Sequence, residues 1–312
     1  MSKTFIYASS AISTQNSFEG NSINNFTSIE SSKSLIEPEY KEYIKPMMIR
    51  RMSKATKMSV ACSFKCLADI NLEQPDAIIV GTGLGALAHT VKFLQVSTTD
   101  EEKVLPPTSF IQSGHNTIAG QIALLLGTDC YNMTHVQQAI SFENALMDAQ
   151  LNIGEGKQAV LTGAVDEHID ILDDLANRFN IDNQISSQFS EGCGFFILGP
   201  DESKAKVELL GVSILRENNI AGSISTFLAK YHLQVEDINM GFIGYNLTID
   251  QNIDLPFEVL CYTDFGGRHF SSSAFGFYLA VMHLQQEQAN NYTLVVNIAS
   301  ENEVGLTILK SV

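Results

Sequence analysis

Asp76-Ala-Ile-Ile-Val-Gly-Thr-Gly-Leu-Gly-Ala86 is the stretch that decides the fold. Its first five residues form a short apolar run rich in β-branched side chains, which is typical of a strand buried on both faces. The glycines at 81, 83 and 85 then predict a tight turn at the end of that strand. A buried strand of this kind indicates a sheet covered by helices.

The rest of the chain alternates between strand-like and helix-like patterns, as in α/β proteins. The second half repeats the order of the first, so we expect a duplicated βα unit with halves at residues 1–200 and 201–312. Residues 162–167 are predicted to be a turn, and residues 96–103 a solvated loop. The predicted strands are 1–10, 76–80, 158–161, 190–198, 206–215, 240–245, 292–299 and 305–311, and the predicted helices are 53–72, 117–126, 138–152, 169–177, 223–233 and 272–285.

Composition excludes several classes of function. A formal net charge of −16 repels nucleic-acid backbones. The chain contains no run of 18 apolar residues and no secretory leader, so we expect a cytoplasmic protein that does not span a membrane. Five scattered cysteines predict reduced thiols, and no Cys or His spacing suits zinc. We therefore expect no metal and no cofactor.

The turn at Gly81–Ala86 also has the G-x-G-x-x-A spacing of dinucleotide-binding turns. Such sites need a second strand that ends in an acidic residue about twenty positions later. Residues 96–103 lack the apolar run that such a strand requires. The spacing therefore does not predict a nucleotide site.

One segment departs from the acidic balance of the chain. Residues 45–57 contain five of the nineteen basic residues: Lys45, Arg50, Arg51, Lys54 and Lys57. These charges either solvate the first turns of a helix or form a docking surface for an acidic partner. The sequence leaves both interpretations open.

Five motifs in a fixed order resemble those of the β-ketoacyl synthases. In that family an Arg-Arg-Met segment opens a helix, a Val-Gly-x-Gly segment ends a strand, and a Gly-Gly-x-Glu segment follows the helix of the nucleophile. A Gly-Glu-Gly-Ala-Gly hairpin and a Gly-His-x-x-Gly-Ala-Ala-Gly helix start complete the order. The corresponding segments here are Arg50-Arg-Met-Ser53, Ile79-Val-Gly-Thr-Gly83, Gly163-Ala-Val-Asp-Glu167, Ser190-Glu-Gly-Cys-Gly194 and Arg268-His-Phe-Ser-Ser-Ser-Ala-Phe-Gly276.

The resemblance implies a thiolase-like fold, in which two pseudo-duplicated βα halves form α-β-α-β-α layers. It also implies a cysteine at the start of the helix around residues 138–152, where the helix dipole would stabilise an acyl-accepting thiolate. Alignment of that helix places the nucleophile position at Ala139, or at Gln138 with a shift of one residue. Neither residue can accept an acyl group.

The other residues that the family uses for condensation are also largely unmatched. The first histidine corresponds to Gly244, in Gly244-Tyr-Asn-Leu-Thr248, and the lysine corresponds to Asp264. Only the second histidine is retained, as His269. The family's closing Gly-Phe-Gly loop reads Ile298-Ala-Ser-Glu-Asn-Glu303. The resemblance therefore extends to the fold but not to the condensing residues.

A ketosynthase-like chain without its cysteine resembles the chain length factors of type II polyketide systems, some of which have a glutamine there, as at Gln138. The resemblance implies a heterodimer with an active ketosynthase, paired through the edge of a central strand and supplied by an acyl carrier protein. Pocket residues near the interface, such as Phe142 and Met147, would then limit the partner's product, whether a fatty acid, an aryl polyene or another polyketide.

Two other classes of function stay open from the sequence. One is an acyl-transfer or acyl-processing enzyme with a non-standard site around His115, His135 and His269. The other is a non-catalytic homodimer that binds an acyl ligand or a carrier protein. A pocket lined by these histidines with strongly shifted pKa values would favour the enzyme, whereas a filled cavity at the elbow and an extensive apolar dimer face would favour a partner subunit.

Overall fold

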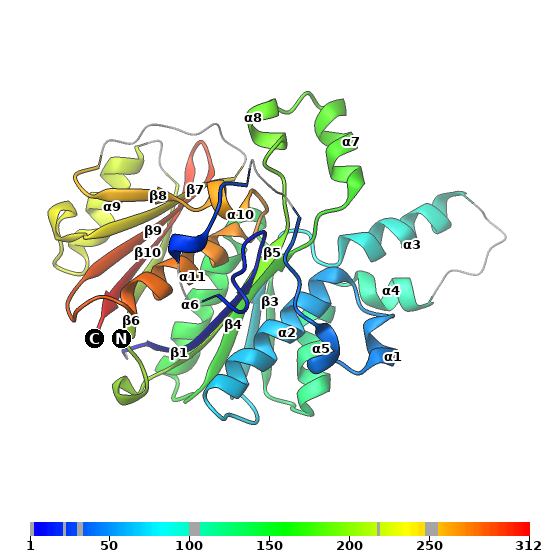
Figure 1. Ribbon diagram of the computed structural model, residues 1–312, viewed down its shortest axis with the longest axis horizontal. Coiled ribbons are helices and arrows are strands. Elements are labelled where there is room, and N and C mark those ends of the chain that lie inside the picture. Colours follow the sequence, from blue (N-terminus) through cyan, green and yellow to red (C-terminus); the bar gives the residue numbers. More distant parts are fainter. Residues whose placement is uncertain (1–2, 21–22, 30–33, 100–106, 217–218, 247–254) are drawn as a thin grey trace.

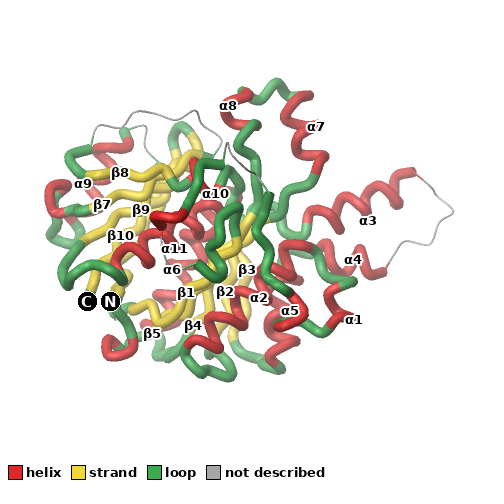
Figure 2. Tube along the Cα trace, in the orientation of Figure 1, coloured by secondary structure: helices red, strands yellow, loops and turns green. Residues whose placement is uncertain are grey.

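The computed structural model describes residues 3–20, 23–29, 34–99, 107–216, 219–246 and 255–312. The chain folds into a mixed α/β structure built from two similar halves (Figure 1). Figure 2 shows the strands gathered in the middle of the molecule, with helices on both sides.

The first half contributes five strands to the sheet, in the order β3-β2-β4-β5-β1. Strands β2, β3 and β4 are parallel, whereas β5 runs antiparallel to both β4 and β1. Strand β3 therefore lies at one edge of the sheet. The bounds are β1 Phe5–Ile12, β2 Ala77–Gly81, β3 Tyr131–His135, β4 Val160–Asp166 and β5 Gly192–Gly199.

The second half repeats this arrangement, because its strand order β8-β7-β9-β10-β6 matches that of the first half strand by strand. The halves join where Phe5 and Ile6 of β1 pair with Glu208 and Val207 of β6. The bounds are β6 Val207–Leu215, β7 Met240–Tyr245, β8 Glu258–Cys261, β9 Tyr292–Ser300 and β10 Glu303–Ser311. The expected duplication is present in the topology.

Five helices form the layers on either side of and between the half-sheets. Helices α2 (Lys54–Asp69) and α5 (Thr117–Leu126) cover the outer face of the first half, and α9 (Ile220–Ala229) covers that of the second. Helices α6 (Ser141–Gly154) and α11 (Ser272–Leu284) lie between the half-sheets and contact strands of both. The thiolase-like layer order that we expected is therefore confirmed.

An aromatic cluster joins the two central helices. The ring of Phe277 on α11 lies 4.7 Å from that of Phe196 on β5 and 5.5 Å from that of Phe142 on α6, both with edge-to-face geometry. All three side chains are fully buried. Helix α11 is buried nearly all round, which explains why its sequence lacks a polar face.

The remaining helices are peripheral. Helices α3 and α4 form an arm that projects at the right of Figure 1, and α7 and α8 lie at the top. Among the helices of the described residues, none is long and apolar enough to span a membrane. The bounds are α1 Pro46–Ile49, α3 Leu87–Thr99, α4 Pro107–Ser113, α7 Asp170–Arg178, α8 Asn183–Ser186 and α10 Thr263–Gly266.

Two local predictions from the sequence were wrong. Residues 162–166 continue β4 rather than forming a turn, because Gly163 lets β4 lie close to its neighbour. A Cβ at that position would stand 2.3 Å from the carbonyl oxygen of Gly194. Residues 96–99 belong to α3 rather than to a loop, and residues 100–103 lie outside the described residues. Strands β3 and β8 are additional elements.

Phe277→Ala should destabilise the chain by about 3–5 kcal/mol, because the truncated side chain leaves a cavity between the halves. Phe179→Ala provides the control, since Phe179 is exposed at the end of α7 and its loss should change stability by less than about 0.5 kcal/mol. Urea unfolding measures both. Equal effects of the two substitutions would contradict a core that depends on this aromatic cluster.

Candidate functional site

The position expected for the nucleophile lies on a sharp elbow between β3 and α6. Gln138 has a φ of 51°, a left-handed conformation that is costly for a residue other than glycine. A short 3-10 helix, Gln138–Ile140, leads from the elbow into α6. The Gln138 side chain is exposed, whereas Ala139 is buried. An amide or a methyl group, and no thiol, therefore stands at this elbow.

Apolar side chains cover the inner side of the elbow. Ala139 and Ile140 pack with Ala299 of β9, and the cluster is completed by Ile214 of β6 and Phe270. Phe270 follows His269 in the sequence and lies against Gly83 at the end of β2. The space beside Ala139 is thus occupied by the protein's own side chains.

Tyr262 occupies the space above Gly244, the position that we aligned with the family's first histidine. A Cβ at Gly244 would lie 2.0 Å from the tyrosine ring, so no larger residue fits there without movement. Tyr262 is fully buried, and its hydroxyl lies 3.5 Å from Asn297 Oδ1. Leu247 and Thr248, which belong to the same motif, lie outside the described residues.

A buried polar cluster that was not predicted from the sequence lies beneath the elbow. Asn297 of β9 donates from Nδ2 to the Ala139 carbonyl at 2.7 Å and to Glu143 Oε1 at 2.9 Å. Burial raises the pKa of Glu143 to about 7, and its Oε2 has no hydrogen-bond partner among the described residues. The only signal in the sequence was an acidic residue near the start of an otherwise apolar helix face.

His269 lies in a different environment from the elbow. Its ring lies against Gly192 of β5, and its Nδ1 is 3.1 Å from the Ser271 hydroxyl. Burial lowers the pKa of His269 to about 3, and the nearby His168 adds to the decrease. The imidazole is therefore neutral at physiological pH.

His269 borders a cavity of about 110 Å³. Arg268 and Asn246 line the same cavity, but their polar groups make internal hydrogen bonds. Arg268 Nε donates to Gln188 Oε1 at 2.6 Å, and Asn246 Nδ2 donates to the His269 carbonyl at 2.9 Å. Asp264, at the position of the family's lysine, lies in α10, where its carbonyl accepts a hydrogen bond from the Ile29 amide at 2.7 Å.

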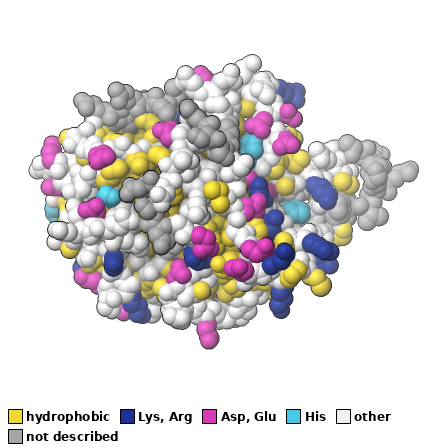
Figure 3. Space-filling view, viewed as in Figure 1, with side chains coloured by type: hydrophobic (Ala, Val, Ile, Leu, Met, Phe, Trp, Pro, Cys, Tyr) yellow, Lys and Arg dark blue, Asp and Glu magenta, His cyan; other side chains and the backbone are white. Residues whose placement is uncertain are grey.

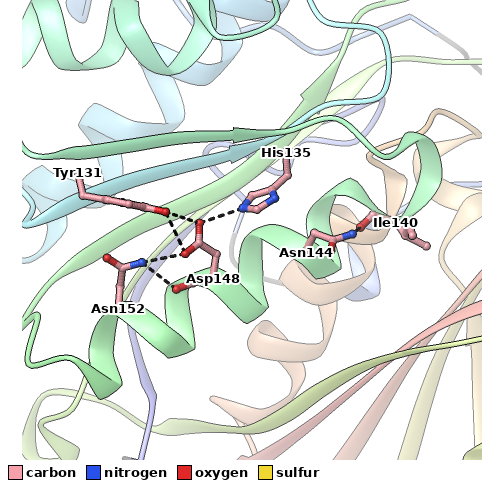
Figure 4. A network of polar contacts seen from close by, with 6 residues as sticks. All are labelled: Tyr131, His135, Ile140, Asn144, Asp148 and Asn152. Carbon is pink, nitrogen blue, oxygen red and sulfur yellow. Dashed lines mark hydrogen bonds and ion pairs between the residues drawn. The ribbon is translucent and has the colours of Figure 1, made fainter.

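The other two histidines of interest lie elsewhere. His135, at the end of β3, places Nε2 2.9 Å from Asp148 Oδ2, and Asp148 also binds the Tyr131 hydroxyl and Asn152 (Figure 4). His115 lies against Gly85, before α5. Within the described part of the chain, no hydrogen bond joins any two of His115, His135 and His269. These three histidines therefore do not form one site in the described residues.

Phe142 and Met147 lie in contrasting positions on α6. Phe142 is buried in the aromatic cluster, whereas Met147 is exposed on the outer side of the helix. Only Met147 can meet a partner without rearrangement of the core.

In the basic segment, residues 45–57, some cations contact other side chains of the described chain and others form no ion pair there. Lys54 pairs with Glu191, and the Lys57 ammonium lies 5.3 Å from the Tyr40 ring. Lys45, Arg50 and Arg51 are exposed, and no ion pair is formed by their side chains in the described residues. In the sequence they flank the apolar Met47, which is 79% exposed. Figure 3 shows basic and apolar side chains side by side in the right half of the view.

The carboxylates of Asp166 and Glu167 have structural roles. Asp166 accepts hydrogen bonds from the amides of Gly83 at 3.0 Å and Leu84 at 2.8 Å, which fixes the glycine turn after β2. Burial raises its pKa to about 6 although these donors oppose the shift. Glu167 accepts from the amides of Ala55 at 3.0 Å and Ala88 at 2.8 Å, at the first turns of α2 and α3. These contacts account for both carboxylates without a catalytic role.

Comparison with known proteins assigns the chain to a structural class. Residues 28–177 match the family model described as β-ketoacyl synthase, N-terminal domain. This amino-terminal part of the chain is similar to the β-ketoacyl synthases. No curated protein matches this ketosynthase-like chain in sequence.

Solved structures resemble the ketosynthase-like chain over its whole length. "The ishigamide ketosynthase/chain length factor" has a TM-score of 0.79 at 15% identity, with 99% of both chains covered. The type II PKS acyl-carrier protein in complex with its ketosynthase, AntDE:AntF, gives 0.77 at 15% identity, with 100% and 99% covered. The ketosynthase ApeO with its chain length factor ApeC from Xenorhabdus doucetiae gives 0.61 at 15%, with 99% of both covered. At this identity the likeness establishes the fold.

Glu143→Gln should flatten the dependence of stability on pH. Because burial raises the pKa of Glu143 to about 7, its stabilising contribution is complete at low pH and is lost as the pH rises through 7. The wild-type chain should therefore lose up to about 3 kcal/mol between pH 5 and pH 8 from this group. Glu143→Gln, which stays neutral, should not show that loss.

Urea unfolding at the two pH values measures the difference. Glu236→Gln is the control, because Glu236 is exposed and its substitution should preserve the wild-type profile. An unchanged pH profile in Glu143→Gln would show that Glu143 is ionised in the folded chain.

Proposed function

We propose that this chain is a non-condensing partner subunit of an active ketosynthase, similar in role to a chain length factor. The observation that supports the proposal most strongly is the elbow, where Gln138 and Ala139 stand in place of a nucleophile. Neither side chain can form the thioester on which condensation depends. The chain therefore needs another subunit to supply the chemistry.

The surroundings of the elbow support the same proposal. Phe270, Ile214 and Ala299 fill the space beside it, and Tyr262 fills the space above Gly244. His269 is neutral and lies against Gly192. A substrate carbonyl would find neither an oxyanion site nor room near Ala139. This arrangement favours a partner subunit over an enzyme that uses His115, His135 and His269.

The edge strand β3 suits the pairing that this function requires. Its one neighbour within the described sheet is β2, so the backbone groups along its other edge are available to another strand. Tyr131, Met133 and Val136 are exposed along this edge, and Met147 and Leu151 are exposed on the adjacent α6. We propose that the ketosynthase partner pairs here and that Met147 contacts it near the growing chain.

We further propose that the free cations flanking α1 dock the acyl carrier protein. Carrier proteins are acidic, and Lys45, Arg50 and Arg51 lie on either side of the exposed Met47 in the sequence. Cations around an apolar contact provide both attraction and a buried centre for such a partner. The AntDE:AntF structure contains a carrier protein with its ketosynthase, which agrees with a docking surface of this kind.

Co-expression with candidate ketosynthases from the same genome tests the main proposal. Size-exclusion chromatography with mass analysis should reveal a one-to-one heterodimer that Met133→Lys abolishes, because a charge on the edge strand opposes strand pairing. Val259→Lys is the matched control, since Val259 lies on the other edge strand, β8, and both side chains are 40% exposed. A stable homodimer that binds no ketosynthase would sink the proposal.

Arg50→Glu combined with Arg51→Glu should weaken binding of the acyl carrier protein by about tenfold or more at low salt, because repulsion replaces attraction. Isothermal titration with the purified heterodimer measures the affinity. Lys206→Glu with Lys230→Glu makes the same change of charge at exposed sites in the second half. An equal loss of affinity in both double variants would assign the effect to overall charge rather than to α1.

A further inference from the structure

Three adjacent elements form a single surface, which we call the β3 face. It consists of exposed apolar side chains from α5, β3 and α6: Leu124, Tyr131, Met133, Val136, Met147 and Leu151. Leu124 and Leu151 are 67% and 63% exposed, which is unusual for leucines on neighbouring elements. The face surrounds the open edge of the sheet.

The elements that form the β3 face contain acidic residues but no lysine or arginine. Between Lys103 and Lys157 the sequence contains no lysine or arginine, and α5, β3 and α6 all lie in this span. Its acidic residues are Asp129, Glu143, Asp148 and Glu155. The face therefore combines apolar side chains with carboxylates and no permanent cation of its own.

Two of the four carboxylates are satisfied within the chain. Glu143 is buried beneath the elbow. Asp148 accepts from the Tyr131 hydroxyl at 3.1 Å and from Asn152 Nδ2 at 2.9 Å, and lies 2.9 Å from His135 Nε2. These contacts hold Tyr131 and His135, the first and last residues of β3, against α6 (Figure 4).

The other two carboxylates remain open to a partner. Asp129 and Glu155 are exposed, and among the described residues no hydrogen bond or ion pair engages either side chain. Asp129 directly precedes β3, and Glu155 follows α6 close enough to raise the pKa of Tyr131 slightly, after burial and Asp148. The free negative charge thus lies at the amino-terminal end of β3.

A second copy of this chain would meet that charge poorly. Twofold pairing of one edge strand with itself is antiparallel, so the start of one β3 faces the end of the other. The end of β3 is His135, whose ring already contacts Asp148 of the same chain at 2.9 Å. The strand continues into Val136, Gln137 and Gln138, none of which is cationic. The net charge of −16 on each copy adds long-range repulsion.

We propose that the β3 face is specific for a different chain, which presents lysine or arginine side chains to Asp129 and Glu155 around an apolar centre. The inference rests on the proposed function, because it takes the ketosynthase as the occupant of this face. It adds that the pairing discriminates between hetero- and homodimer by charge. Apolar contacts supply the affinity, and the two carboxylates supply partner choice and association rate.

The test compares Asp129→Lys with Glu155→Lys, made together, against Glu236→Lys with Glu287→Lys. The second pair is exposed in the other half of the chain and changes the net charge by the same amount. The probe is the ketosynthase that co-elutes with the wild-type chain, and surface-immobilised kinetics measures association at low and high salt. The first double variant should associate roughly tenfold more slowly at low salt, with the gap closing at high salt.

The milder pair Asp129→Asn and Glu155→Gln guards against misfolding and should give an intermediate rate. If the wild-type complex forms but the two double lysine variants associate at the same rate, the charge inference is wrong while the proposed function stands. If the chain instead forms a homodimer whose β3 amides are protected from hydrogen exchange, the inference and the proposed function both fail. The inference is supported if association slows in the Asp129 and Glu155 variants but not in the Glu236 and Glu287 variants.

Discussion

The packing of α6 against α11 between the two half-sheets is the constraint on which the rest of the structure depends. Neither half can bury its inner face alone, because each supplies one central helix and one sheet. The edge-to-face contacts of Phe277 with Phe142 and Phe196 fill the centre of this sandwich. Once the two helices are fixed, the start of α6 must lie where β9 and β10 of the other half approach it.

The contact between the second half and the start of α6 determines the surroundings of the elbow. Asn297 of β9 binds the Ala139 carbonyl and Glu143, so the second half holds the elbow of the first in place. The same proximity brings Ala299 and Phe270 against Ala139. Gln138 adopts a left-handed conformation at this elbow. Under the proposed function, the elbow keeps the backbone of a condensing site while apolar side chains fill the space beside it.

The binding sites that we propose lie on exposed surfaces of the chain. The two edges of the sheet differ, because β3 is flanked by exposed large apolar residues on both α5 and α6, whereas β8 exposes Val259 beside Glu258 among the described residues. The free cations that flank α1 lie on another part of the chain, so the surfaces proposed for the ketosynthase and for the carrier protein are separate. A subunit of this kind would act by what it binds rather than by what it converts.

The sequence by itself determined the fold class and the duplication, because apolar periodicity and motif order are local and survive divergence. The helix at Thr117–Leu126 and the strand at Met240–Tyr245 were predicted to the residue. Gly163 was assigned to a turn, because the need for a close neighbouring strand is invisible in the chain. Only the tertiary structure decided that Tyr262 fills the space above Gly244, that Phe142 is core while Met147 is exposed, and that β3 is an open edge. Those facts depend on which distant segments come together, and the sequence pattern of a single segment does not encode its neighbours.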